Sequence, residues 1–215
     1  MGAKTWMIAY VDEDAVRAFE ARPIIDRDAS TTLVHRLFPK EKLEAIDDGM
    51  LSYTSPPDDE IYVGCFSGVS VVAAKEFGID FPSQLALRFL EPGLEKRVYL
   101  HAMHSVVDWF AFAIWERGKL VRSLSLSPDS GIIEDIGPRR PFELRYWEGQ
   151  HPAVDPADDD SGYPFPFHPL ELGEVALREL FGYQIEGFVD DCPVAADEIP
   201  LLSFKRKKTS AWKFW

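Results

Sequence analysis

Apolar and polar side chains alternate with a period of two along two neighbouring segments, 109–116 and 119–127. This alternation is typical of β-strands, whose successive side chains point to opposite faces of a sheet. Arg117 and Gly118 join the two segments, and glycine readily adopts the positive φ that a two-residue hairpin loop requires. The region from 97 to 137 therefore predicts an antiparallel hairpin at the centre of a sheet.

The register of this hairpin follows from counting back from its loop. Glu116 pairs with Lys119, and at the open end Asp108 lies opposite Ser127. Both faces are then rich in apolar side chains, which predicts a hairpin covered on both sides. A shift of one residue would exchange the faces, so each assignment depends on this register.

Polar side chains gather at the open end of the hairpin. The cluster comprises His104, Asp108, Ser127, Asp129 and Ser130. In a catalytic interpretation His104 is the general base and Asp108 orients it, while Ser127 or Ser130 is the nucleophile. In the alternative interpretation the same groups form a hydrogen-bonded plug that satisfies the backbone of the following turn. The pattern leaves both open.

His101 and His104 are three residues apart in a segment, 97–103, that is predicted to be a strand. Strand geometry sends the two imidazoles to opposite faces, so His101 is a separate candidate for binding. If the segment were helical, His101, His104 and Asp108 could share a face and hold a metal ion. The strand pattern argues against that arrangement, and no metal is expected.

The remaining periodic segments complete a single α+β domain over residues 1–204. The further predicted strands are 5–11, 43–46, 60–66, 69–74, 183–189 and 199–204, of which the last two are edge strands. The predicted helices are 12–21, 27–38, 82–90 and 169–182. Residues 47–49 are expected to turn. Because alternating βαβ units are absent, we expect a predominantly antiparallel sheet with central hairpins, packed by three to four helices.

Residues 149–169 are rich in proline and interrupt the periodic patterns. Long loops in compact domains are commonly functional or mobile. The candidates for a binding surface in this loop are Phe165, Phe167 and His168. The acidic run at 158–160 is expected to be solvated, since it lacks the ligand spacing of a calcium-binding loop.

The composition limits the classes of molecule that the domain is expected to bind. The 215 residues carry a net charge of −13, which repels phosphate and disfavours nucleic acid and anionic membranes as partners of the domain. Cys65 and Cys192 match no zinc or redox spacing, and Cys65 is expected to be a small buried hydrophobe. No cofactor motif is complete. Without a secretory signal pattern or an apolar run of ~20 residues, the chain is expected to be cytoplasmic.

Residues 205–215 form a basic and aromatic tail on this acidic domain. Such a segment could bind a nucleic acid or a membrane surface. It could equally fray or fold onto the acidic body. A flexible or self-docked tail is the favoured interpretation.

Four segments of the chain carry a family resemblance. The longest is HAMHSVVDWFAFAIWERGKLVRSLSLSPDSGIIEDIG, and the others are residues 2–5, 62–66 and 163–173. The chain, over roughly residues 2–188, resembles an uncharacterised actinobacterial domain-of-unknown-function family, the DUF6928-like family. The resemblance implies no activity, cofactor or partner.

Two functions of different class are compatible with these patterns. The favoured one is a non-catalytic protein-binding or regulatory module that engages another protein through aromatic and acidic surfaces. It is motivated by the high acidity and by the incomplete catalytic set. The alternative is a small hydrolase or transferase that uses the His/Asp/Ser cluster at the open end of the hairpin. Neither interpretation requires a cofactor, and the oligomeric state stays open.

Overall fold

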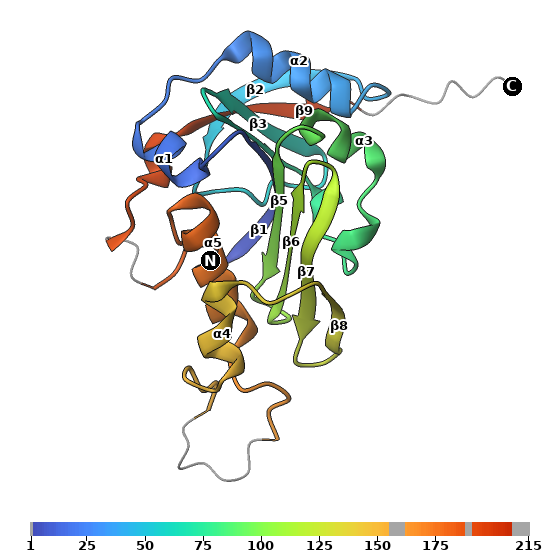
Figure 1. Cartoon of the computed structure of the whole chain (residues 1–215). Helices are drawn as coiled ribbons and strands as arrows, with labels where there is room; N and C mark the ends of the chain where they lie inside the picture. The colour runs from blue at the N-terminus through green and yellow to red at the C-terminus, as the bar shows by residue number, and fades with distance from the viewer. Residues whose placement is uncertain (1, 155–161, 188–190, 208–215) are drawn as a thin grey trace, which may run out of the picture.

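The protein is seen here as a computed structural model that describes residues 2–154, 162–187 and 191–207. Within these residues one nine-stranded antiparallel sheet has the strand order β2-β9-β3-β4-β1-β5-β6-β7-β8 (Figure 1). The α+β class and the antiparallel sheet predicted from the sequence are confirmed. The acidic run at 158–160 and residues 208–215 of the tail lie outside the described residues.

The strands are β1 (Lys4–Val11), β2 (Leu43–Met50), β3 (Glu60–Phe66), β4 (Val69–Ala73), β5 (Arg97–His104), β6 (Trp109–Glu116), β7 (Lys119–Ser127), β8 (Gly131–Ile136) and β9 (Pro200–Arg206). The α-helices are α1 (Ala15–Glu20), α2 (Arg27–Leu37), α3 (Leu87–Leu90), α4 (Pro141–Trp147) and α5 (Pro169–Phe181). Short 3₁₀ turns are η1 (Lys75–Phe77), η2 (Pro82–Gln84), η3 (Glu91–Gly93) and η5 (Ala196–Glu198).

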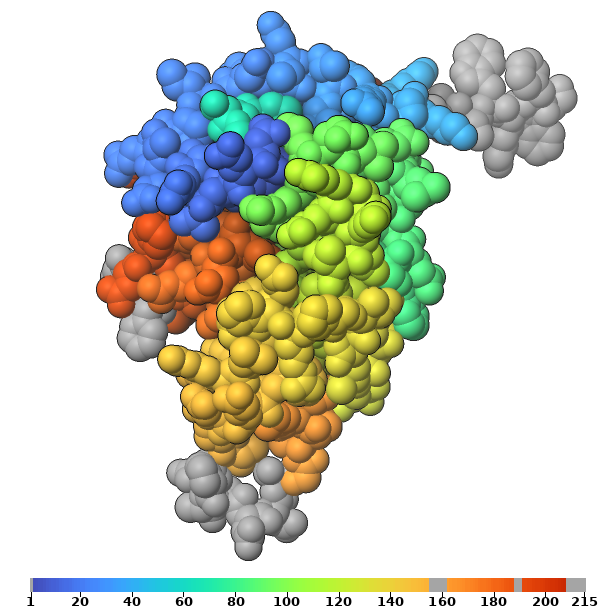
Figure 2. Space-filling view, viewed as in Figure 1, coloured from blue at the N-terminus to red at the C-terminus, as the bar shows by residue number. Residues whose placement is uncertain are grey.

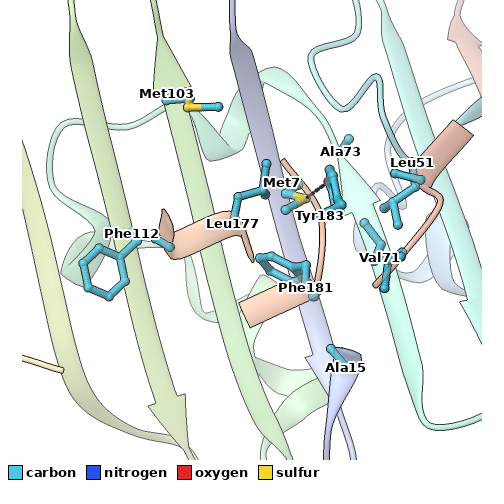
Figure 3. Packing of buried hydrophobic residues seen from close by; sticks show 14 of the residues in the cluster. Met7, Ala15, Leu51, Val71, Ala73, Met103, Phe112, Leu177, Phe181 and Tyr183 are labelled. Carbon is cyan, nitrogen blue, oxygen red and sulfur yellow. Dashed lines mark hydrogen bonds between the residues drawn. The ribbon is translucent and has the colours of Figure 1, made fainter. Parts of the chain in front are cut away.

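Apolar side chains cover both faces of the sheet. On one face α1, α4 and α5 pack over the strands, and α5 lies across β5 and β6 (Figure 1). Met7, Leu177 and Phe181 meet there, and the Tyr183 hydroxyl donates to Met7 Sδ over 3.7 Å (Figure 3). On the other face α2 and α3 cover a second apolar cluster. Two-sided coverage explains why β6 is buried along almost its whole length.

Two segments that are far apart in the sequence, α1 with the residues after it and the segment around η5, lie against each other. In Figure 2 the orange-red segment near residue 195 abuts the blue segment near residue 20. Arg22 and Glu198 form an ion pair of 3.3 Å across this boundary. β9 inserts between β2 and β3, so the strand expected at the edge is interior. That expectation was wrong because strand order is set by pairing between distant segments.

The predicted hairpin exists, but its register differs from the expected one. Arg117 and Gly118 both have positive φ, at 48° and 73°, and Glu116 pairs with Lys119 as expected. A β-bulge then follows Trp115, so Ile114 pairs with Arg122, not with Val121. The extra residue shifts all later pairs by one.

The bulge has a packing reason. It brings Leu124 and Leu126 onto the face that carries Phe110 and Phe112, where all four are fully buried. The expected pairing of Asp108 with Ser127 is therefore wrong: β6 begins at Trp109, and Ser127 pairs with Gly131 of β8. The hairpin also lies toward one end of the sheet, whose centre is β1.

Three further local expectations were wrong. Residues 47–49 do not turn but continue β2 through a bulge. The expected helix 82–90 is divided into η2 and α3, because Leu85 and Ala86 are extended. Packing outweighs helical propensity here, since the break still leaves Leu85 and Phe89 buried in the same cluster. Residues 183–187 form no strand.

A buried ion-pair network fastens α4 to the edge of the sheet. Arg122 of β7 is fully buried, and its guanidinium donates to both carboxylate oxygens of Glu143 at 2.9 and 2.6 Å. It also binds Asp135 of β8. Glu143 is equally buried and accepts the Arg140 backbone N–H, which closes the N-terminus of α4. Each buried charge thus has a partner, as burial of ions requires.

Candidate functional site

A hollow of about 370 Å³ opens beside the ends of β1, β5 and β6. We call it the tryptophan hollow. Its lining includes Trp6, Asp80, His104, Trp109, Ser127 and Asp129. Ser130 also lines it. Four of the five polar residues that were expected to cluster are therefore brought together, and Asp108 is not among the residues that line the hollow.

Strand pairing brings the aromatic wall together from distant segments. His104 pairs with Lys4 of β1 and with Trp109 of β6, so Trp6, His104 and Trp109 project from the same face. The ring centroids of Trp6 lie 5.5 Å from His104 and 5.9 Å from Trp109. Gly78 permits this packing, because an added Cβ would lie 2.7 Å from Trp6 Cε3.

Carboxylates and an imidazole line the tryptophan hollow, and the ammonium group of Lys4 lies close to it. Partial burial lowers the pKa of His104, and the nearby charge of Lys4 lowers it further, so the imidazole is neutral at neutral pH. Asp80 and Asp129 are exposed, and neither forms an ion pair with any residue that the structure describes. Two uncompensated carboxylates therefore stand beside two indoles.

Ser127 is bonded to the backbone of the turn that follows it. Ser127 Oγ accepts the backbone N–H of Ser130 at 3.2 Å, which is the bond expected of a structural plug. Across the described residues, no hydrogen bond joins His104 to Ser127 or Ser130. A general base must reach the hydroxyl proton, so the geometry does not form a nucleophile–base pair.

Asp108 is the last residue of the turn between β5 and β6, with φ of 47°. Its Oδ2 lies 3.7 Å from Nε2 of His168. His168 is the N-cap of α5, where its Nδ1 accepts the Leu170 N–H, and Pro169 begins the helix as predicted. Asp108 and His168 thus form their own pair, apart from the tryptophan hollow.

His101 lies inside the core, with no exposed surface. Its Nε2–H donates to the Gly173 carbonyl at 2.9 Å, and its Nδ1 accepts from the Thr5 hydroxyl at 2.7 Å. Burial lowers the pKa of His101 to about 4. His101 and His104 do point to opposite faces of a strand, as predicted. The metal arrangement that required a helix here is wrong, because residues 97–104 are β5.

Phe165 and Phe167 were expected on a binding surface, but both are buried, Phe167 completely. Phe167 packs against Tyr146 and Trp147 of α4, with ring centroids at 5.8 and 4.9 Å. The proline-rich loop is thus pinned to the core by its aromatic side chains. The sequence of a proline-rich loop does not show whether its aromatic side chains are exposed or packed against the core.

A second and larger hollow, of about 1080 Å³, adjoins the first. The two share Trp6 and Gly78, and we call them together the trough. The larger hollow is lined by Lys4 and Lys75 near Trp6, and also by Tyr53, Ser55 and Tyr183. Sequence analysis missed it, because its lining comes from five separate segments and no short motif marks them.

Comparison with known proteins gives a family and no function. A family model described as "Family of unknown function (DUF6928)" matches residues 5–204. No curated protein matches the chain. No solved structure does so either. Among the described residues, no group of three or more His, Cys, Asp or Glu side chains is arranged to hold a metal ion. No helix in the described ranges is both long and apolar enough to cross a membrane.

Proposed function

Because the chain belongs to the DUF6928 family, whose function is unknown, we propose a function from its trough. The protein is a non-catalytic protein-binding module. Its tryptophan hollow takes a lysine or arginine side chain from a segment of another protein. The observation that carries this proposal is the pair of indoles beside two carboxylates that lack an ionic partner.

The chemistry of the tryptophan hollow suits a basic side chain. Trp6, which is partly exposed, and the 7% of Trp109 that remains exposed offer apolar surface to the methylene stem of lysine or arginine. A cation near an indole gains about 0.5–1 kcal/mol. Asp80 and Asp129 supply the opposite charge, each worth about 0.2–1 kcal/mol at an exposed position. His104 is neutral and does not oppose the incoming charge, whereas the Lys4 ammonium, 4.9 Å from the centroid of the Trp6 ring, directs the incoming cation toward Asp80 and Asp129.

The charge of the whole chain supports the same class of partner. A net charge of −13 attracts basic polypeptide segments and raises their rate of encounter, whereas it repels the phosphates of nucleic acids. The lack of a hydrogen bond between His104 and either serine in the described chain favours binding over catalysis.

The test uses octapeptides blocked at both ends, with a central lysine or with norleucine in its place. Norleucine keeps the apolar stem and removes the ammonium group. Calorimetry is expected to show tighter binding of the lysine peptide. The double variant Asp80→Asn/Asp129→Asn is expected to weaken that binding about fivefold to tenfold, since about 1 kcal/mol corresponds to fivefold.

The matched control is Glu95→Gln/Glu179→Gln, which changes the net charge equally at two exposed positions away from the trough. It should leave the affinity within twofold of the wild-type value. Equal binding of the lysine and norleucine peptides would contradict the proposed function. So would equal weakening by the two double variants, because long-range charge alone would then explain the binding.

A further inference from the structure

We propose that the segment bound in the trough is a polypeptide C-terminus that ends in lysine or arginine. The basic side chain enters the tryptophan hollow, and the terminal carboxylate binds Lys4 and Lys75 in the larger hollow. This inference rests on the proposed function and adds the part of the partner that is recognised.

Lys4 places a cation at the junction of the two hollows. Its Nζ lies 4.9 Å from the centroid of the Trp6 ring, and its side chain is only partly exposed. Within the described ranges no carboxylate pairs with it, although the chain has 36 acidic residues. An ammonium group held beside an indole without a counter-ion is available to an anionic ligand.

Lys75 lies on the same side of Trp6. It follows Ala74, whose N–H donates to the Trp6 carbonyl at 3.0 Å, and its own carbonyl accepts the Gly78 N–H at 3.1 Å. Lys75 is exposed and forms no ion pair with the described residues. Two ammonium groups thus line the larger hollow close to the shared indole.

The two hollows carry different charged groups close to Trp6. Asp80 and Asp129 line the tryptophan hollow, whereas Lys4 and Lys75 line the larger one. The larger hollow is also lined by the carboxylates of Asp58, Asp197 and Glu198. A complementary ligand carries a cation and an anion on either side of Trp6. In a polypeptide, a free carboxylate and a basic side chain belong to one residue only at a C-terminal lysine or arginine. Capture of a terminal carboxylate is an established mode of peptide recognition.

The shape of the larger hollow accommodates the rest of the segment. Besides the lysines, its lining includes Tyr53, Val194 and the carboxylates of Asp58, Asp197 and Glu198. Glu198 is already paired with Arg22. In this arrangement the residues that precede the C-terminal residue of the partner lie in the rest of the larger hollow. The larger hollow then holds main chain, and the tryptophan hollow holds a single side chain.

The test compares two octapeptides that end in lysine, one with a free carboxylate and one with a C-terminal amide. Wild-type protein is expected to bind the free acid at least fivefold more tightly. Lys4→Gln and Lys75→Gln should each reduce this preference to about twofold or less, while Lys75→Gln leaves the affinity for the amide unchanged. Lys119→Gln, at the distant hairpin loop, is the control and should keep the full preference.

The results that would contradict the two proposals differ from each other. Equal affinity for acid and amide would overturn the C-terminal inference, and the proposed function would stand if a central lysine still bound better than norleucine. A preference for the acid that persists in both lysine variants would overturn the placement of the carboxylate. Failure of every lysine peptide to bind would overturn both proposals.

Discussion

Replacing Arg122 by methionine is expected to lower the free energy of unfolding by about 3–5 kcal/mol. Arg122 and Glu143 are both without exposed surface, and two hydrogen bonds join the guanidinium to the carboxylate. Methionine fills part of the space but leaves the carboxylate of Glu143 buried without its cation. Urea-induced unfolding, followed by circular dichroism, measures the loss.

Two further variants separate the buried pair from a general effect of lost charge. Arg122→Met/Glu143→Leu removes both charges together and should recover much of the loss, because no ion is then stranded. Arg17→Met removes an arginine whose side chain is 87% exposed and should change stability by less than about 1 kcal/mol. If Arg122→Met costs no more than Arg17→Met, the network does not fasten α4 to the sheet.

Acidification from pH 7 to pH 4 is expected to remove about 3 kcal/mol of stability through His101 alone. The pKa of this histidine falls from its ordinary 6.5 to about 4 in the folded protein, because burial disfavours the charged ring. Between these values the unfolded chain binds a proton that the folded chain does not bind. Stability therefore falls as the pH drops through 6.5, and the loss is complete near pH 4.

The contribution of Glu174 to stability depends on pH in the opposite direction. It partly offsets the loss of stability that His101 causes on acidification. Burial raises the pKa of Glu174 to about 7, although its carboxylate accepts the backbone N–H groups of Ile185 and Glu186. Here the folded protein binds the extra proton, so stability is greatest at low pH and falls as the pH rises through 7. The stability of the wild-type protein is therefore expected to change little between pH 4.5 and pH 6.5.

Comparison with His101→Asn isolates the histidine, because the contribution of Glu174 cancels in the difference. Thermal or urea unfolding of both proteins across pH 4–7 gives the two curves. The variant is less stable at pH 7 because it loses core packing. Its disadvantage should shrink by about 3 kcal/mol at pH 4. Parallel curves would show that His101 does not resist protonation in the folded state.

Much of the fold could be predicted because local patterns and tertiary structure agree. Alternation marked β6 and β7, and the loop at Arg117 and Gly118 has the backbone that a two-residue hairpin needs. For α5 the signals were Pro169 at its start and Gly182, in the left-handed conformation, at its end. Each of these signals acts within a few residues.

The register beyond Trp115 could not be predicted, because a bulge adds one residue without breaking the alternation that marks the strand. Only burial of Leu124 and Leu126 on the phenylalanine face requires it. His104, Ser127 and Ser130 of the tryptophan hollow could be predicted as site residues from the sequence, because their side chains can act as bases or nucleophiles. Trp6 and Asp80 were missed, since they approach His104 only through the pairing of β1 with β5 and the packing of η1.

The most direct test of the trough is a nuclear magnetic resonance titration that follows the six indole N–H signals. The blocked lysine octapeptide is added, and the signals are assigned with single Trp→Phe variants. We expect the indole N–H signals of Trp6 and Trp109 to shift. The signal of Trp147, which lies on α4 and packs against Phe167, should stay unchanged. Shifts confined to other indoles, or no shift at saturating peptide, would contradict the claim that the trough binds a basic segment.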